Sequence, residues 1–127
     1  MVMKAIDDAA TVGWFTWGTG TVGITKGETL RLSFVNLGSI KGPVLCGVWQ
    51  NPRLLQDWHV LEPGESDICD LRAAEIPKEL FDKTGRVQVR AFIKSSARTV
   101  RANLEVFDNK TGRTSIALPL QELGGSD

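Results

Sequence analysis

The sequence predicts an all-β protein built as an antiparallel β-sandwich of about seven or eight strands with one short crossover helix. Three observations predict it. Apolar and polar residues alternate over several runs of strand length, turn residues separate these runs at regular intervals, and one short segment alone has helical character. We expect the sandwich over residues 21–120, between an N-terminal arm of residues 1–20 and a tail of residues 121–127.

The clearest strand signal lies in residues 21–37. Leu30, Leu32 and Phe34 fall on one face of this run, after a turn at Lys26 and Gly27. Strict alternation over this length predicts a strand with one buried face. Two later runs share the pattern, with inward positions at Val87, Val89, Ala91 and Ile93, and at Val100, Ala102, Leu104 and Val106.

The middle of the chain predicts further strands. Residues 43–50 carry apolar side chains on both faces, which indicates a central strand or a covered outer face. Residues 54–60 give a weaker signal because their apolar residues do not share one face, and residues 66–71 follow a Pro-Gly turn. Residues 72–81 are helix-like, with Pro77 suited to the first helical position. The Asp, Asn and Gly residues of 108–112 predict a hairpin turn.

Composition narrows the possible functions. A chain of 127 residues is one domain by length, and its 15 basic and 15 acidic residues give a formal charge of zero. This balance argues against nucleic acid as a partner. No apolar window is long enough for membrane insertion or for a signal peptide, which favours a cytoplasmic protein or a virion component over a secreted or cell-surface one.

Cys46 and Cys69 both lie in strand-like runs, so they form either an inter-strand disulfide or two buried free thiols. Free thiols are favoured because no secretory signal is present. His59 shares a strand face with Asp57, but zinc sites normally have three or four protein ligands. We therefore expect a surface or partly packed His59, no metal site, no cofactor and no enzymatic activity. A thiol catalyst made of Cys46 and His59 is disfavoured by the apolar neighbours of Cys46.

Two charged groups of side chains are assigned to solvated surfaces. The acidic residues between 62 and 70 do not match a calcium loop. The arginines between 86 and 101 lack the outward aromatic residues that stack on single-stranded nucleic acid. Neither group predicts a site.

The aromatic residues are the remaining signal, because the chain has four tryptophans and no tyrosine. We expect the binding residues to be Trp14, Phe15, Trp17, Trp49 and Trp58, the first three in the glycine-rich arm. Large aromatic side chains dominate protein–protein hot spots. The arm aromatics have three possible places: packed on their own sandwich, on a neighbouring subunit, or on a sugar or other ligand.

Several segments fall in a familiar order: TVGITKGETLRLSFVNLG, a Pro-Gly-Glu-Ser turn leading to DICDLR, GRVQVRAFI, and LEVFDNKTGRTS. Together they resemble uncharacterised bacterial proteins with a single immunoglobulin-like β-sandwich. The resemblance covers about residues 21–118 and rests on structural motifs, so it implies a fold and no catalytic residue. The tryptophan-rich arm departs from it.

These observations predict a non-catalytic subunit that acts by protein association, as a self-assembling shell, filament or adhesion component. The arm would add to the sheet edge of a second copy or of another protein subunit. The alternative is a carbohydrate- or small-ligand-binding module that uses exposed tryptophans.

Overall fold

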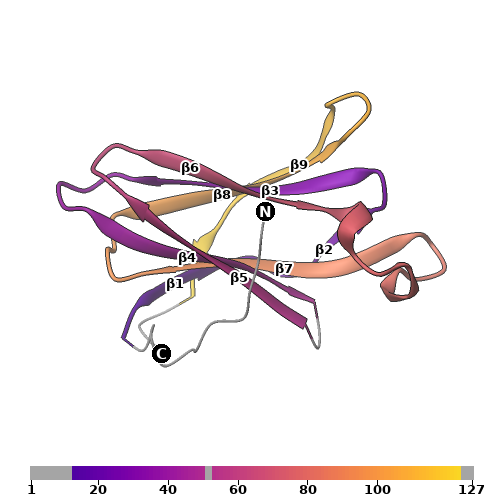
Figure 1. The fold of residues 1–127 in the computed structure, drawn as a ribbon, viewed down its shortest axis with the longest axis horizontal. Coiled ribbons are helices and arrows are strands. Elements are labelled where there is room, and N and C mark those ends of the chain that lie inside the picture. The colour runs from indigo at the N-terminus through magenta and orange to yellow at the C-terminus, as the bar shows by residue number, and fades with distance from the viewer. Residues whose placement is uncertain (1–12, 51–52, 124–127) are drawn as a thin grey trace.

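The computed structural model describes residues 13–50 and 53–123 and confirms the all-β sandwich (Figure 1). Its strands are β1 (Phe15–Gly18), β2 (Val22–Thr25), β3 (Glu28–Asn36), β4 (Gly42–Gln50), β5 (Arg53–Leu61), β6 (Ser66–Arg72), β7 (Arg86–Ser95), β8 (Val100–Asp108), β9 (Thr114–Pro119) and β10 (Gln121–Glu122). A six-stranded sheet has the order β10-β1-β7-β4-β5, with β2 also paired to β7, and a four-stranded sheet has the order β6-β3-β8-β9. The immunoglobulin-like assignment within this class stays a prediction.

The core lies between the two sheets, where the predicted alternation places it. Leu30, Leu32 and Phe34 of β3 are 1%, 0% and 2% exposed. The predicted inward residues of β7 and β8 are likewise buried. Each large apolar side chain that is fully buried in this way stabilises the fold by about 1.5–3 kcal/mol relative to its exposed state. The period-2 pattern therefore identified the residues that hold the sheets together.

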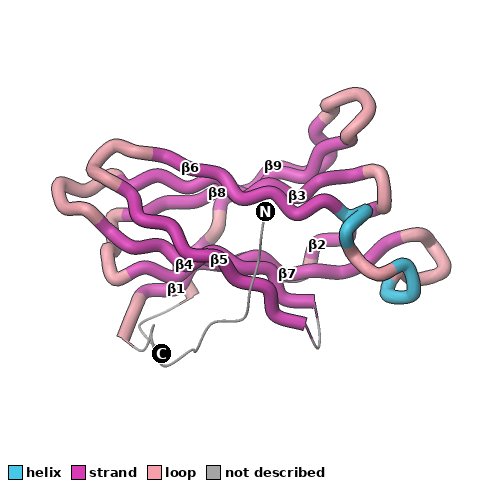
Figure 2. The backbone as a smooth tube through the Cα atoms, in the orientation of Figure 1, coloured by secondary structure: helices cyan, strands magenta, loops and turns pink. Residues whose placement is uncertain are grey.

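The predicted crossover helix over residues 72–81 is replaced by two single 3₁₀ turns, η2 (Ala73–Glu75) and η3 (Lys78–Leu80) (Figure 2). Ile76 lies between them with extended backbone, at φ −83° and ψ 135°. The residue before a proline is pushed out of the helical region by the proline ring. Pro77 therefore separates two turns instead of starting one helix. No helix among the described residues is long and apolar enough to cross a membrane.

The N-terminal boundary lies earlier than residue 21. Residues 15–18 form β1, which pairs with β7 on one side and with β10 on the other. The two strands beyond the predicted number are thus β1 and β10, both too short to show alternation. Residues 1–12 of the predicted arm and residues 124–127 of the predicted tail lie outside the described residues.

β5 and β6 bring one edge of the two sheets together. They are consecutive in the chain, and each is the terminal strand of its own sheet. The turn that connects them contains Gly64 at φ 78°, a left-handed conformation that glycine adopts without a steric penalty. We call the inward-facing edge between these two strands the β5–β6 seam.

Candidate metal centre

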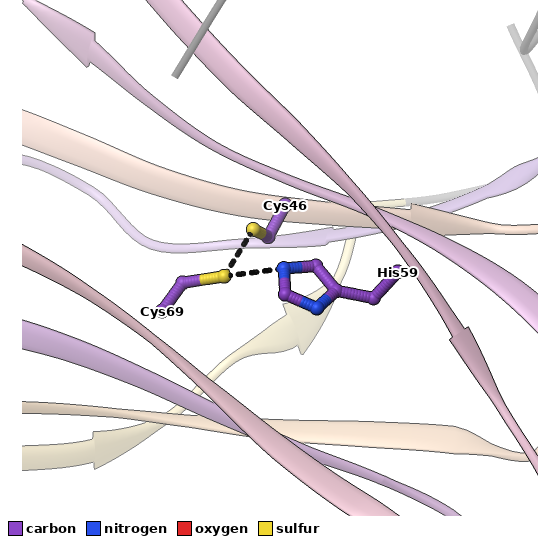
Figure 3. A group of neighbouring side chains, drawn as sticks. All are labelled: Cys46, His59 and Cys69. Carbon is purple, nitrogen blue, oxygen red and sulfur yellow. Dashed lines mark hydrogen bonds between the residues drawn. The ribbon is translucent and has the colours of Figure 1, made fainter. Parts of the chain in front are cut away.

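Two cysteines and the one histidine of the chain converge in the β5–β6 seam. Cys46 comes from β4, His59 from β5 and Cys69 from β6, as Figure 3 shows. The Cys46 and Cys69 Sγ atoms lie 2.7 Å apart, and Cys69 Sγ lies 2.8 Å from His59 Nε2. All three possible ligand atoms lie within 4.8 Å of one another, and both cysteines are free thiols. The favoured free-thiol state therefore describes this structure, but the two sulfurs are direct neighbours.

Strand register explains why these side chains share one space. In the β4–β5 ladder, Cys46 lies opposite Asp57 and Val44 lies opposite His59. Opposite residues of an antiparallel pair project to the same face, as do residues two positions apart on one strand. Cys46, Asp57 and His59 therefore point into the sandwich. Cys69 lies opposite the buried Leu32 in the β3–β6 ladder, so it points inward from the facing sheet.

Two carboxylates flank the imidazole of His59. Asp67 Oδ2 lies 2.9 Å from His59 Nδ1, and Asp57 Oδ2 lies 3.5 Å from His59 Nε2. The second oxygen of each carboxylate accepts a hydrogen bond from the next backbone N–H, at Ile68 for Asp67 and at Trp58 for Asp57. Both acids are therefore held with one oxygen on the backbone and the other toward the histidine.

Within the seam, solvent exposure increases from the cysteines to the carboxylates. Cys46 is 0% exposed and Cys69 is 3% exposed. The side chains of His59, Asp57 and Asp67 are 16%, 29% and 47% exposed. Phe34 packs against the imidazole edge to face, with ring centroids 5.1 Å apart. The sulfurs thus lie at the inner end of the group and the carboxylates at its solvent side.

Hydrogen bonds among these groups set their protonation. The hydrogen bond from Cys46 lowers the pKa of Cys69 to about 6, helped by His59 and opposed by burial. The same hydrogen bond, together with burial, raises the pKa of Cys46 far above its ordinary value. The hydrogen bond to Cys69 raises the pKa of His59 to about 9, against the effect of burial and with a further contribution from Asp67. The directions of these pKa shifts favour a thiolate on Cys69 that accepts hydrogen bonds from the Cys46 thiol and from the His59 imidazolium.

Cys69, His59 and Asp67 are connected in the order nucleophile, base and orienting acid, as in thiol-dependent acyl transfer. Such a reaction requires a substrate carbonyl within about 3 Å of the sulfur. Cys69 is 3% exposed, and its sulfur already contacts Cys46 and His59. The burial of the nucleophile therefore argues against this chemistry, although the triad order fits it.

The donor types, two thiol sulfurs and an imidazole nitrogen, are those that bind a soft metal ion. Zinc binds thiolate sulfur at about 2.3 Å, imidazole nitrogen at about 2.0–2.1 Å and carboxylate oxygen at about 2.0–2.2 Å. In a tetrahedron of these bond lengths, the nitrogen and oxygen ligands lie about 3.4 Å apart and two sulfurs about 3.8 Å apart. The His59 Nε2 to Asp57 Oδ2 distance of 3.5 Å matches the first value. The sulfurs, at 2.7 Å, must separate by about 1 Å to take up an ion. The distance from Cys69 Sγ to His59 Nε2 must likewise increase from 2.8 Å to about 3.6 Å.

The expected binding residues of the arm lie elsewhere. Trp17 is 3% exposed and belongs to the core, so it is not available to a partner. Phe15 packs against the core, with the Arg98 guanidinium 5.4 Å above its ring. Trp14 packs edge to face on Trp58, with ring centroids 5.3 Å apart. Trp14, Phe15 and Trp17 therefore pack on their own sandwich, which was one of the three places considered for the arm aromatics.

Trp49 and Trp58, the other expected binding residues, are both half-buried. Trp49 has the guanidinium of Arg90 at 5.9 Å from its ring centroid. Binding of a sugar or of a protein partner at these side chains stays a prediction.

Inspection of the sequence alone missed the set formed by Cys46, Asp57, His59, Asp67 and Cys69. The sequence suggested Asp57 with His59, Cys46 with His59 and Cys46 with Cys69 only as separate pairs, and none of these pairs predicted a site. A signal was present: Asp57-x-His59 and Asp67-x-Cys69 each put two polar side chains on one face of consecutive strands, on either side of a Pro-Gly turn. Two such pairs joined by a turn predict one group when both faces point inward.

No protein-family model matches the chain, and no curated protein matches it. Among solved structures, the fold is similar to one described as the crystal structure of Thermotoga maritima 1070, with a TM-score of 0.63 and 15% sequence identity. The match covers 90% of this chain and 98% of the other. At this identity the similarity extends to the fold alone, and the candidate metal centre rests on the geometry above.

Proposed function

We propose that this protein is a zinc-binding β-sandwich whose metal ion cross-links its two sheets at the β5–β6 seam. Cys46, His59 and Asp57 supply ligands from the six-stranded sheet, and Cys69 supplies one from the four-stranded sheet. The observation that carries the proposal is the convergence of two thiol sulfurs and an imidazole nitrogen within 4.8 Å of one another.

The ligand types favour zinc. Thiolate and imidazole ligands select Zn²⁺ and other soft ions, whereas Mg²⁺ and Ca²⁺ prefer an all-oxygen set. One histidine with two cysteines also differs from the two histidines and one cysteine of blue-copper sites. Cys46, His59 and Cys69 are three ligands, and Asp57, 3.5 Å from His59 Nε2, would be the fourth. Four protein ligands would close the coordination sphere, which is typical of structural zinc sites and not of catalytic ones.

Asp67 supports the proposal from outside the coordination sphere. Metal-binding histidines commonly donate their second ring N–H to a carboxylate, which fixes the tautomer and the orientation of the ring. The 2.9 Å contact between Asp67 and His59 Nδ1 leaves Nε2 facing the two sulfurs. Asp67 is therefore a positioning residue.

Metal titration of the reduced full chain tests the proposal. We expect one Zn²⁺ per chain by calorimetry, and with Co²⁺ as a probe the thiolate charge-transfer and visible bands of a tetrahedral site. Cys69→Ser should weaken zinc binding by at least about 100-fold, because it removes one of four ligands. Zinc at about a thousandfold excess over its Kd should stabilise the wild type by about 4 kcal/mol.

Asp82→Asn is the matched control. Asp82 is an exposed carboxylate in the β6–β7 connection, where it accepts hydrogen bonds from Thr84 and Arg86 and none from the seam. This variant should bind zinc as the wild type does. Equal zinc affinity of the wild type and Cys69→Ser would show that the proposed site is wrong.

A further inference from the structure

We propose that Cys46 and Cys69 are the site of a reversible modification: a peroxide oxidises them to a disulfide that joins the two sheets and excludes the metal. The exclusion of the metal rests on the proposed zinc-binding function, whereas disulfide formation does not. No other cysteine competes, because the chain has two.

The spacing of the sulfurs lies between the two states. A disulfide bond is about 2.05 Å long, so the sulfurs at 2.7 Å need to approach by about 0.7 Å. A tetrahedral zinc ion would hold them about 3.8 Å apart. Small movements of two side chains therefore lead to either state, and the two states require opposite movements.

The disulfide and the ion compete for the same electrons. A thiolate binds zinc through a sulfur lone pair that carries the negative charge, and a disulfide sulfur has lost that charge to its covalent bond. Oxidation would leave His59 and Asp57 as two ligands of the proposed four. We therefore expect the oxidised protein to release its ion.

Burial determines which sulfur reacts first. Cys46 is completely buried, whereas Cys69 is 3% exposed and contacts His59, whose side chain is 16% exposed. A peroxide as small as H₂O₂ approaches from the His59 side and meets Cys69. Cys46 then lies behind Cys69 as the resolving thiol.

The reaction balances in two steps. Cys69 sulfur attacks one peroxide oxygen, so an S–O bond forms and the O–O bond breaks. The proton held in the hydrogen bond between Cys69 and His59 passes to the departing oxygen, which leaves as an alcohol or, from H₂O₂, as water. Cys46 sulfur then attacks the sulfenic acid on Cys69, so the S–S bond forms, the S–O bond breaks, and the Cys46 proton leaves with the hydroxyl as water. The two sulfurs together lose two electrons, and the peroxide gains them.

Peptide mapping of the full chain tests the disulfide. The reduced, metal-free protein is exposed to H₂O₂, alkylated and digested with trypsin, which cleaves after Arg53 between the two cysteines. We expect a bridged peptide pair and loss of both free thiols, reversed by dithiothreitol. In Cys46→Ser, Cys69 should accumulate as a sulfenic acid that dimedone traps, and in Cys69→Ser, Cys46 should stay unmodified in the folded protein.

A second measurement tests the exclusion. Zinc-loaded protein should release one ion for each disulfide formed, and the oxidised protein should bind zinc at least about 100-fold more weakly than the reduced protein. Zinc affinity that is unchanged by oxidation would overturn the exclusion. Retention of both thiols in the folded wild type, while the urea-unfolded chain is oxidised, would overturn the disulfide itself.

The two proposals fail separately. A reduced protein that binds no zinc but forms the disulfide would end the zinc proposal and leave the modification site standing. A reduced protein that binds zinc but forms no disulfide would end the modification proposal and leave the zinc proposal standing.

Discussion

The two edges of the sandwich have the same kind of strand connection, but the interior of one edge is apolar and that of the other is polar. At one edge β5 passes into β6, and at the other β9 passes into β10, so at each edge consecutive strands cross from one sheet to the other. At the β9–β10 edge the interior is filled by apolar side chains, those of Trp17, Leu118 and Leu120. At the β5–β6 seam it is filled by sulfur, imidazole and carboxylate groups.

This difference indicates that a polar interior is not a general requirement for closing an edge of this sandwich. The β9–β10 edge is closed by the mainly apolar side chains of Trp17, Leu118 and Leu120. Polar groups in a protein interior reduce stability unless each finds a partner, and the five polar side chains named at the β5–β6 seam all have one. A group of mutually partnered polar side chains, of the types that can bind a metal, at an edge of this kind is expected where the residues serve a function.

The largest effect is expected from truncation at the apolar edge. Trp17→Ala should lower the free energy of unfolding by about 3–5 kcal/mol, because it removes a large buried side chain and leaves a cavity. Urea unfolding of the metal-free protein measures this loss. Zinc affinity of the folded fraction should stay at the wild-type value, since Trp17 lies at the opposite edge from the seam.

Trp14→Ala serves as the matched control, because Trp14 is half-buried and contacts Trp58. It should destabilise the protein clearly less than Trp17→Ala. If Trp17→Ala instead left the free energy of unfolding unchanged, the assignment of Trp17 to the core would be wrong. The predicted role of Trp17 in binding a partner would then stand.

An intermediate effect is expected at the polar seam. Asp67→Ala should weaken zinc binding by about 10–100-fold, which corresponds to about 1.4–2.7 kcal/mol, because His59 loses the carboxylate that orients it. Asp67→Asn keeps an oxygen that accepts the Nδ1 hydrogen bond and should lose less. Calorimetric zinc titration of both variants measures the difference, and stability of the metal-free protein should change little.

Zinc affinity that is equal in the wild type and Asp67→Ala would exclude a positioning role for this carboxylate. The nearly half-exposed Asp67 would then have no part in zinc binding, and the solvent side of the seam would have no function that the β9–β10 edge lacks.

Much of the fold was predictable from the sequence, because alternation reports whether a side chain points inward. Leu32, Val89 and Leu104 were all assigned to the interior on this basis, and all are buried. The short strands β1 and β10 were not predictable, since four and two residues are too few to show a period. Trp17 was consequently placed in an arm, although it completes the core.

The candidate site was predictable only in halves. Alternation puts Asp57 and His59 on one face of a strand, and it does the same for Asp67 and Cys69. It does not say which residues face each other across the gap between two sheets. That information depends on strand order and on the crossing from β5 to β6, neither of which is a local property of the chain.

The smallest effect is expected from pH, and it separates the interiors of the two edges most cleanly. Cys69 and His59 of the seam titrate, whereas Trp17, Leu118 and Leu120 at the β9–β10 edge do not. In the metal-free protein the pKa of Cys69 is lowered from 9.0 to about 6, and that of His59 is raised from 6.5 to about 9. The lowered pKa of Cys69 adds stability that is complete above pH 9 and is lost as the pH falls through about 6. The raised pKa of His59 adds stability that is complete below pH 6.5 and is lost as the pH rises through about 9.

These two contributions change in opposite directions over the same window, so the seam should make the free energy of unfolding nearly independent of pH between about 6 and 9. Ultraviolet thiolate absorbance should nevertheless rise by one equivalent per chain with a midpoint near pH 6, because the proton that leaves Cys69 is not accompanied by one from His59. Cys69→Ser should lack this rise, and the urea-unfolded chain should titrate near the ordinary pKa of 9.0. A folded wild type that also titrates near pH 9 would show that no thiolate–imidazolium pair forms, and the seam would then differ from the apolar edge in composition but not in charge.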